Sequence, residues 1–401
     1  MGHVLRVELR SADRLSAAER ALWARFRDAD PALSSPYFDL RYVQAAAESA
    51  PGAGLAILWR GERIEAFFPF QRRGGLLQPL GAPLTDYHGL IARPGADVDM
   101  RWLLQRLEGR RFRFGGLLGV AADDTRDTAG RPAMIADLRG GYEAYLAQRR
   151  AAGQGGYLKD KRRRARQLED QHGAPVFRWS KDPADLDMII ADKRAQMRRT
   201  GQHDVFATRW TRALLHSLLA AQTPEFGLRI AVLEVAGRPI AAEAGLLSGG
   251  AYHLWFPTYD PEFSKFSPGA LLTFETLRAL ADEGVACADF GPGAEPYKNA
   301  FADPGREVLE GDITVDPLLE GIRALVRQTT AGRPELYDRL SGLYRRLDRR
   351  IDRITACEPA LEGRIAAAGR SLGALGRRHR NAGLGLGVSI AGLSAGLLLL
   401  D

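Results

Sequence analysis

The segment Ala251–Ala302 restricts the possible folds of this chain more than any other, because strand and helix signals alternate along it. Ala251–Tyr259 is aromatic and apolar, which indicates a buried strand. Ala270–Glu283 has the period of a helix and lies between a Pro-Gly pair and a glycine, which are common at the two ends of helices. Val285–Phe290 is a short apolar run bounded by glycine and proline, as a second strand would be. The segment therefore predicts a helix that begins in the gap between two strands.

The expected start of that helix has the features of an anion-binding site. Ser267 stands at the N-cap position and Pro268 at the first helical position, where both residue types are favoured. Gly269 leaves the backbone accessible, and the first N–H groups of a helix point outward without partners, so they can hold a phosphate. We therefore interpret Lys265, Ser267, Pro268 and Gly269 as candidate residues for binding a phosphate-bearing co-substrate. The alternative is an ordinary helix start with no ligand.

The same pattern of elements recurs in the first half of the chain. Residues 56–66 and 232–242 each indicate a hairpin that turns at a glycine, and further landmarks follow at nearly the same offset. The paired landmarks are Gly61 and Gly237, Pro94-Gly95 and Pro268-Gly269, Glu108-Gly109 and Glu283-Gly284, and Phe114-Gly115 and Phe290-Gly291. A shared register of this kind predicts two copies of one α/β module.

Each copy has the order helix, helix, hairpin, strand, helix, strand, with two helices, Tyr142–Arg149 and Tyr157–Gln171, linking the copies. This order predicts an α/β fold of layered α+β type, with mixed sheets flanked by helices. The predicted units are residues 1–140 for the first copy, 141–175 for the linking helices, 176–316 for the second copy, 317–380 for a helical appendage and 381–401 for an apolar tail.

The C-terminal part differs in character from the rest of the chain. Leu318–Arg370 is charged and helical, and its apolar positions form one seam along the helix. The seam consists of Leu340, Leu343, Leu347, Ile351 and Ile354. Ala382–Leu400 has no charge and follows an arginine-rich run, which predicts a membrane-associated tail that enters from the cytoplasmic side. The alternative is a packed or floppy terminal segment.

The composition indicates the class of protein but does not identify the reaction. The chain has 401 residues, a net charge of +7 and two cysteines, Cys287 and Cys357. Two cysteines make no disulfide framework, and no metal-ligand spacing occurs, so we expect a cytoplasmic protein without a metal, either free or peripheral to the inner membrane. The positive charge favours anionic partners such as CoA phosphates, nucleotide sugars or lipid headgroups. No DNA-binding motif is present.

One carboxylate is placed where it could act as a base. Asp289 ends the second strand of the key segment, and a buried carboxylate there is costly unless it is paired or hydrogen-bonded. It is interpreted as a structural acceptor for a neighbouring loop, or else as a general base or a residue that orients the amine or hydroxyl of a substrate. Lys298 is expected to pair with Asp289, a phosphate or an acidic substrate, or else to be a solvated lysine. No Ser/His/Asp or Cys/His arrangement suggests a covalent intermediate.

These motifs together resemble the bacterial GNAT-type acetyltransferases associated with cellulose and exopolysaccharide synthesis, the BcsL/CelD-like family with its BioF2-like acetyltransferase domain. The resemblance covers residues 150–305, with a weaker echo in the first copy. It is carried by Tyr259-Asp260-Pro261, Ser267-Pro268-Gly269, Asp289-Phe290-Gly291 with Gly293, Glu295-Pro296-Tyr297-Lys298 and the basic helix Arg162–Gly173. GNAT enzymes usually carry a Gln/Arg-x-x-Gly-x-Gly/Ala loop, and this chain has a single glycine there. Acyl-CoA binding at the loop is thus an inference from the fold that the resemblance implies.

The resemblance implies tandem GNAT-like domains, with acetyl-CoA or another acyl-CoA as co-substrate and Asp289, Tyr297 and Lys298 as catalytic residues. Tyr297 would protonate the departing CoA thiolate. The first copy has Arg113 in place of Asp289 and lacks the Tyr-Lys pair, so it is expected to be degenerate and to scaffold the second. The residues expected on the acceptor side are Tyr259, Asp260, Asp86, Tyr87, His88 and Arg163.

Three functions follow from the sequence and its resemblance. The first is acyl transfer from acyl-CoA to an amine or hydroxyl of a sugar, in exopolysaccharide or cell-envelope synthesis, by direct attack on the thioester. The second is a Fem-like ligase that uses aminoacyl-tRNA, which the doubled fold and the basic surface permit. The third is a non-catalytic scaffold of a glycan synthase complex. The identity of the acyl group, the acceptor and the oligomeric state do not follow from the sequence.

Overall fold

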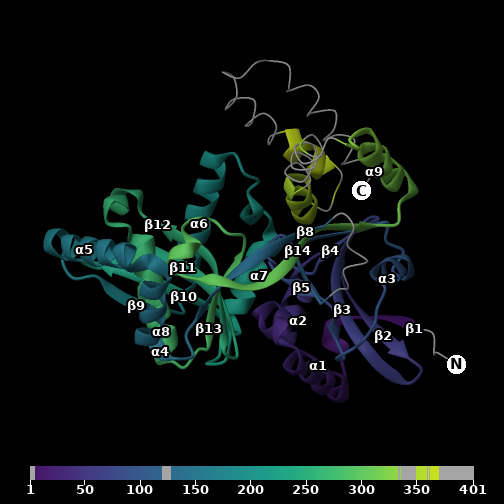
Figure 1. The fold of residues 1–401 in the computed structure, drawn as a ribbon, viewed down its shortest axis with the longest axis horizontal. Coiled ribbons are helices and arrows are strands. Elements are labelled where there is room, and N and C mark those ends of the chain that lie inside the picture. Colours follow the sequence, from purple (N-terminus) through teal and green to yellow (C-terminus); the bar gives the residue numbers. More distant parts are fainter. Residues whose placement is uncertain are drawn as a thin grey trace.

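A single mixed sheet with helices on its faces forms the body of the protein (Figure 1). The computed structural model describes residues 5–119, 128–332, 335, 349–358, 360 and 362–369, and within them the sheet has 14 strands. Twelve of the strands follow one another in the order β1-β2-β3-β4-β7-β14-β8-β13-β12-β11-β10-β9, with β5 beside β7 and β6 beside β3. The mixed α/β class predicted from the sequence is confirmed.

The first half of the chain supplies one end of the sheet and the helices that cover it. Its elements are β1 (Leu5–Arg10), α1 (Ala17–Ala29), η3 (Pro36–Phe38), α2 (Leu40–Ser49), β2 (Ala53–Arg60), β3 (Arg63–Arg73), β4 (Leu76–Pro79), β5 (His88–Gly89), β6 (Ile91–Ala92), α3 (Met100–Arg106) and β7 (Arg111–Leu118). A capping box begins α1, because the Glu19 N–H donates to Ser16 Oγ and the Ser16 N–H donates to the Glu19 carboxylate. The two helices that the sequence predicts ahead of the first hairpin are α1 and α2.

The second half supplies the other end. β8 (Ala129–Asp137) ends the first copy predicted at residues 1–140. The elements that follow are α4 (Gly141–Arg149), α5 (Gly155–His172), β9 (Val176–Ser180), α6 (Pro183–Thr200), α7 (Arg209–Ala220), β10 (Phe226–Val235), β11 (Arg238–Ser248), β12 (Ala251–Tyr259), η7 (Pro261–Phe266), α8 (Pro268–Asp282), β13 (Cys287–Pro292), η8 (Lys298–Ala300), β14 (Asp303–Thr314) and α9 (Pro317–Thr329). The two linking helices are α4 and α5. The strand predicted for 251–259 has these bounds in the structure.

Both predicted hairpins are present, and each turns at its glycine. β2 and β3 pair antiparallel around Gly61, and β10 and β11 pair antiparallel around Gly237. The two glycines have φ angles of 62° and 75°, a region that side chains with a Cβ rarely adopt. Apart from the short strands β5 and β6, strands and helices follow the same order in the two halves.

The two halves exchange a strand at the centre of the sheet. β8 ends the first copy in sequence, yet it pairs with β13 of the second half. β14 comes at the end of the second half, yet it pairs with β7 of the first half, with Asp312 opposite Arg113. β8 and β14 also pair with each other, so they join both halves into one sheet (Figure 1).

The two faces of the sheet have different cores. On one face, α1, α2, α6 and α7 share one apolar cluster that extends across both halves, with Trp23 and Leu214 among its buried members. On the other face, α4, α5 and α8 cover the second half and α3 covers the first, in separate clusters. The shared cluster makes the contact between the halves part of the hydrophobic core.

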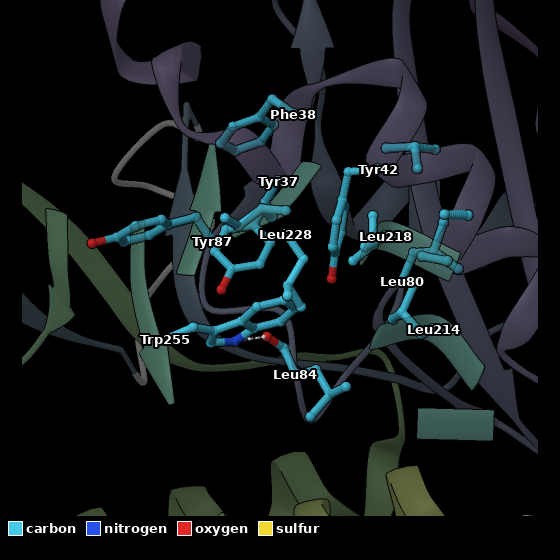
Figure 2. Close-up of a cluster of buried hydrophobic side chains, with 14 of the residues drawn as sticks. Tyr37, Phe38, Tyr42, Leu80, Leu84, Tyr87, Leu214, Leu218, Leu228 and Trp255 are labelled. Atoms are coloured by element: carbon cyan, nitrogen blue, oxygen red, sulfur yellow. Dashed lines mark hydrogen bonds between the residues drawn. The ribbon is translucent and has the colours of Figure 1, made fainter. Parts of the chain in front are cut away.

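Aromatic side chains fill the junction between the halves (Figure 2). Tyr37 from η3 has its ring centroid 5.1 Å from that of Tyr42 and 5.8 Å from that of Trp255 on β12. The Trp255 indole N–H donates to the Leu84 carbonyl at 2.9 Å. Figure 2 shows these rings facing one another, whereas the hydroxyl of Tyr87 points away from the cluster. The side chain of Trp255 therefore holds β12 against the first half.

The C-terminal part returns to the body. Residues 349–357 and 362–369 are helical, and Ile351, Ile354, Ala367 and Ala368 form a small buried cluster. The Arg73 guanidinium donates to the Ala356 carbonyl at 2.9 Å, which ties this segment to β3. The other seam positions, Leu340, Leu343 and Leu347, and the predicted tail at 381–401 lie outside the described residues. Among the described residues, no helix is long and apolar enough to span a membrane.

Candidate functional site

The strands β12 and β13 run side by side for only a short distance. Their parallel pairing includes Ala251 with Cys287, Tyr252 with Ala288 and His253 with Asp289. β12 then continues to Tyr259 alongside β11, without further pairing to β13. The β13-facing edge of β12 therefore offers backbone groups without a strand partner from residue 254 onward. This is the gap that the sequence predicted.

The helix α8 begins beside this gap, and no side chain caps its N-terminus. Ser267 holds the N-cap position in a left-handed conformation, with φ of 58°, and its side chain does not accept from the helix. Its hydroxyl instead accepts a hydrogen bond from Lys161 Nζ at 3.1 Å. A Cβ placed on Gly269 would meet only Tyr259 within 4 Å, so the approach to the first turn is open. The first-turn N–H groups are thus available to an anion, although Ser267 is not the capping residue that the sequence indicated.

Basic side chains of α5 line the same loop. Lys161 contacts Ser267, and the Arg164 guanidinium donates to the carbonyl of Lys265. Lys265 Nζ donates to Gln171 Oε1 at 3.0 Å and lies 4.6 Å from the centroid of the Phe266 ring. The α8 N-terminus therefore has an open backbone and two cations from α5 beside it, which suits the phosphates of CoA.

Asp289 is at the centre of a buried polar network that joins the two halves. Asp289 is 2% exposed. Its Oδ1 accepts a hydrogen bond from the Tyr87 hydroxyl at 2.7 Å and another from the Gly291 N–H at 2.8 Å. Arg306 of β14 lies 3.7 Å from its Oδ2. Burial, and then the Asp289 charge, raise the pKa of Tyr87 far above its usual value, so the phenol stays protonated and donates.

His253 extends this network towards solvent. Its Nε2 lies 2.9 Å from Asp86 Oδ2, and its Nδ1 lies 3.7 Å from Asp289 Oδ1. The His253 side chain is fully buried, whereas the Asp86 side chain is 41% exposed. A Cβ on Gly291 would approach Asp86 and His253 to about 3.5 Å, so the glycine allows this close arrangement. The structure thus brings Asp86, Tyr87 and Asp289 together through His253 and the Tyr87 hydroxyl.

His88 does not join them. It lies on β5 among the rings of Phe112 and Phe114, and neither ring nitrogen has a hydrogen-bond partner among the described residues. Burial lowers the pKa of His88 to about 3, which keeps the imidazole neutral. Its position is that of a core residue of the first half.

The loop after β13 carries Tyr297 and Lys298 in different settings. Lys298 Nζ pairs with Glu295 Oε2 at 2.7 Å and donates to the Pro292 carbonyl at 3.1 Å, and the lysine is buried. It therefore holds its own loop and does not pair with Asp289. Tyr297 is 56% exposed, and the partial burial of its phenol, followed by the charges of Glu295 and Glu243, raises its pKa to about 12. The phenol is protonated at neutral pH and can act as an acid.

The remaining acceptor-side candidates lie around the outer end of the gap. Tyr259 is exposed at the end of β12 beside Gly269. Asp260 accepts from the Glu262 N–H and pairs with Arg238, so it shapes the loop. Arg163 points to the solvent side of α5 and pairs there with Asp160. Arg163 is thus not brought to the other candidates.

Two buried polar residues near the gap were not identified from the sequence. His253 interrupts the aromatic run of β12, and Glu243 interrupts the apolar run of β11. A single charged or polar residue inside an apolar strand is the signal that could have found both. An open pocket of about 730 Å³ lies elsewhere, where Glu48, Trp210 and Cys357 meet, and none of its lining residues belongs to β12, β13 or α8.

Comparison with known proteins adds the type of domain. Residues 155–299 match the family described as acetyltransferase (GNAT) domain. A search of curated protein sequences found no significant match. Among solved structures, the chain is similar to a tandem GNAT protein from the clavulanic acid biosynthesis pathway, with 12% identity over 78% of this chain and 99% of that one and a TM-score of 0.46. It is also similar to FemX, with 9% identity over 79% and 99% of the two chains and a TM-score of 0.46. The region from α5 into η8 therefore matches a GNAT acetyltransferase domain, and this match supports an acyltransferase.

Proposed function

We propose that the chain transfers an acyl group from acetyl-CoA or another acyl-CoA to an amine or hydroxyl of a sugar or glycan precursor, in exopolysaccharide or cell-envelope synthesis. One observation carries the proposal: β12 and β13 part after His253 and Asp289, and the uncapped start of α8 lies beside the gap. The GNAT match over the same elements supports the acyl-CoA donor. The sugar acceptor rests on the resemblance of the sequence motifs.

The donor would lie with its phosphates at the first turn of α8. Lys161 and Arg164 flank this turn, and Gly269 leaves it open, so that backbone N–H groups and cations can share the phosphate charge. Ser267, Pro268 and Lys265 form the loop that the phosphates would contact. The acyl arm would then extend into the gap beside β12.

The chemistry is a direct attack of the acceptor on the thioester. The protein would supply proximity, and the partnerless backbone edge of β12 would supply an N–H donor for the developing oxyanion. Tyr297, protonated and partly exposed, would donate a proton to the departing thiolate. Asp289 would fix the position of β13 at the gap through its hydrogen bonds with Tyr87 and Gly291. Lys298 would fix the loop that carries Tyr297.

The acceptor would approach from the side where polar groups reach solvent. Asp86 is the exposed end of the network that includes His253 and Asp289, and Tyr259 and Asp260 stand at the outer end of β12. Carboxylates and aromatic rings are common partners of sugar hydroxyls and rings. Buried His88 and the solvent-facing Arg163 have no part in this arrangement.

Calorimetric titration with acetyl-CoA tests the donor site. The double variant Lys161→Ala with Arg164→Ala is expected to bind at least about tenfold more weakly, because each cation hydrogen bond to phosphate contributes roughly 1.5–3 kcal/mol. Lys159→Ala, an exposed lysine of the same helix, is the matched control and should bind like the unmodified protein. Absence of binding at millimolar acetyl-CoA, combined with salt-sensitive binding of aminoacyl-tRNA, would instead favour a Fem-like ligase.

A further inference from the structure

Glu243 is a buried carboxylate that no contact inside the protein fully accounts for. It lies on β11 and is 1% exposed, and its Oε1 has no hydrogen-bond partner among the described residues. Ala241 and Leu247, which lie on the same face of β11, belong to the clusters under α5 and α8. A carboxylate in such a position is costly, and a group of this kind is often functional.

Other unsatisfied polar groups surround it. The Tyr252 hydroxyl and the Trp179 indole N–H are buried and also lack a hydrogen-bond partner of normal geometry. The two rings lie 6.1 Å apart. The pairing register places Trp179, Ala231 and Glu243 in one row across β9, β10 and β11. The small Ala231 stands between the tryptophan and the carboxylate in this row, and the Glu243 carboxylate, the Tyr252 hydroxyl and the Trp179 indole N–H share one buried region.

A glycine keeps the tyrosine in this position. A Cβ on Gly245 would lie 2.1 Å from the hydroxyl and Cζ of Tyr252, so the ring can cross β11 there only because residue 245 has no side chain. Gly245 is two residues from Glu243 and therefore on the same face of β11. The tyrosine and the carboxylate are close enough for each to raise or lower the pKa of the other.

The region also borders the gap between β12 and β13. Glu243 pairs with Pro257 of β12, beyond the point where β12 leaves β13. Its charge contributes to the raised pKa of Tyr297, which belongs to the loop after β13. Glu243 therefore lies on the strand next to β12, one strand from the gap, and its charge acts on Tyr297 in the loop after β13.

We propose that Glu243 is the general base that accepts the proton of the attacking amine or hydroxyl. The inference rests on the proposed acyl transfer and names the proton acceptor in it. The acceptor nitrogen or oxygen forms a bond to the thioester carbonyl carbon, the carbon–sulfur bond breaks, and the proton moves to the Glu243 carboxylate. The CoA thiolate takes the proton of Tyr297, and Glu243 then returns its proton to the Tyr297 phenolate through water. Both side chains regain their initial state.

The electrostatics suit this task. Burial raises the pKa of Glu243 to about 8, while the ammonium of Lys193 on α6 and the Tyr252 hydroxyl act in the opposite direction. The titratable groups that act on it therefore come from α6, from β12 and, through Tyr297, from the loop after β13. A base with a pKa near the working pH combines a useful ionised fraction with a strong pull on the proton.

The test uses acetyl-CoA with glucosamine as the amine, and release of the CoA thiol as the readout. The full-length protein is expected to show kcat/KM rising about tenfold per pH unit up to pH 8 and then levelling. Glu243→Gln should lower kcat/KM at pH 8 by about 10²–10⁴ and remove the rise, with unchanged acetyl-CoA affinity in calorimetry. Glu243→Asp keeps a carboxylate and should retain the pH-dependent rise at a lower rate. Glu234→Gln, whose carboxylate pairs with Arg178 on the neighbouring strand, is the control and should match the unmodified protein.

The outcomes separate the two proposals. Activity of Glu243→Gln within threefold of the unmodified protein at every pH would overturn the role of Glu243 and leave acyl transfer standing. A Glu243→Asp variant as inactive as the glutamine variant, with both folded by thermal melting, would also contradict a base and indicate a shape requirement. An unmodified protein that neither binds acetyl-CoA nor releases thiol would overturn the proposed function itself.

Discussion

Replacing Asp312 with alanine is expected to lower the free energy of unfolding by roughly 3–5 kcal/mol, because it leaves buried guanidinium charge without its counter-ion. Asp312 of β14 accepts from Arg111 Nε at 2.7 Å and from an Arg323 guanidinium nitrogen at 2.5 Å. The side chains of Arg111 and Asp312 are almost fully buried. The carboxylate of Asp312 and the two guanidinium groups stabilise the packing of β14 against β7 and α9 only while they are paired. Chemical denaturation monitored by tryptophan fluorescence would measure the change.

Asp137→Ala is the matched control. Asp137 pairs with Arg139 at 2.6 Å, but both side chains are exposed, so its loss should leave the denaturation midpoint unchanged within error. The two arginines lower the pKa of Asp312, so its stabilising contribution is present above the unfolded value near 4 and is lost as the pH falls further. The difference between the unmodified protein and Asp312→Ala should therefore shrink below about pH 4. Equal effects of the two alanine variants at pH 7 would contradict the buried-pair explanation.

Replacing Asp289 with alanine is expected to cost a similar roughly 3–5 kcal/mol of unfolding free energy. The substitution removes the acceptor of the Tyr87 hydroxyl and of the Gly291 N–H, both of which are buried, and the counter-charge of Arg306. Each buried donor that is left without an acceptor destabilises the folded state by the full free energy of its desolvation. Because the network joins β13 to the first half, the loss should appear in global unfolding and not only locally.

Asp282→Ala serves as the control for this prediction, and Tyr87→Phe tests the loss of a single hydrogen bond of the network. Asp282 is an exposed aspartate at the end of α8, and its replacement should change the unfolding free energy by at most about 0.5 kcal/mol. Tyr87→Phe removes one donor but leaves the Gly291 contact, so about 1 kcal/mol is expected. A loss for Asp289→Ala no larger than that for Tyr87→Phe would show that the carboxylate does not hold the halves together.

Local signals made much of the second half predictable from the sequence. The strand at 251–259, the helix after Pro268 and the hairpin at Gly237 follow from periodicity, proline and glycine, which act within a few residues. The exchange of β8 and β14 could not be predicted in this way. Its pairings join residues such as Leu117 and Leu309, and nothing in a short amphipathic strand specifies which distant edge it will pair with. The two-residue strands β5 and β6 leave no periodic signal at all.

The candidate site was predictable in part for the same reason. Asp289 and Tyr87 were both candidates from the sequence, and the structure adds the hydrogen bond that joins them across 202 positions. Lys298 had a plausible partner in Asp289 from the sequence, yet the nearer Glu295 takes it. His253 and Glu243 are single polar residues in apolar strands, and only the register of β11, β12 and β13 shows what they face.

The exchanged strands also bear on how the chain is made. The chain is synthesised from its N-terminus, so β7 is complete long before β14 has been made. β14 is the neighbour of β7 in the sheet. Until then the nascent first half carries a strand edge whose backbone groups have no partner, and such edges readily pair with other chains. A premature stop or a proteolytic cut between residues 119 and 302 would make that state permanent. We expect such fragments to accumulate as aggregates, whereas a cut after β14 should release a body in which β7 has its strand partner.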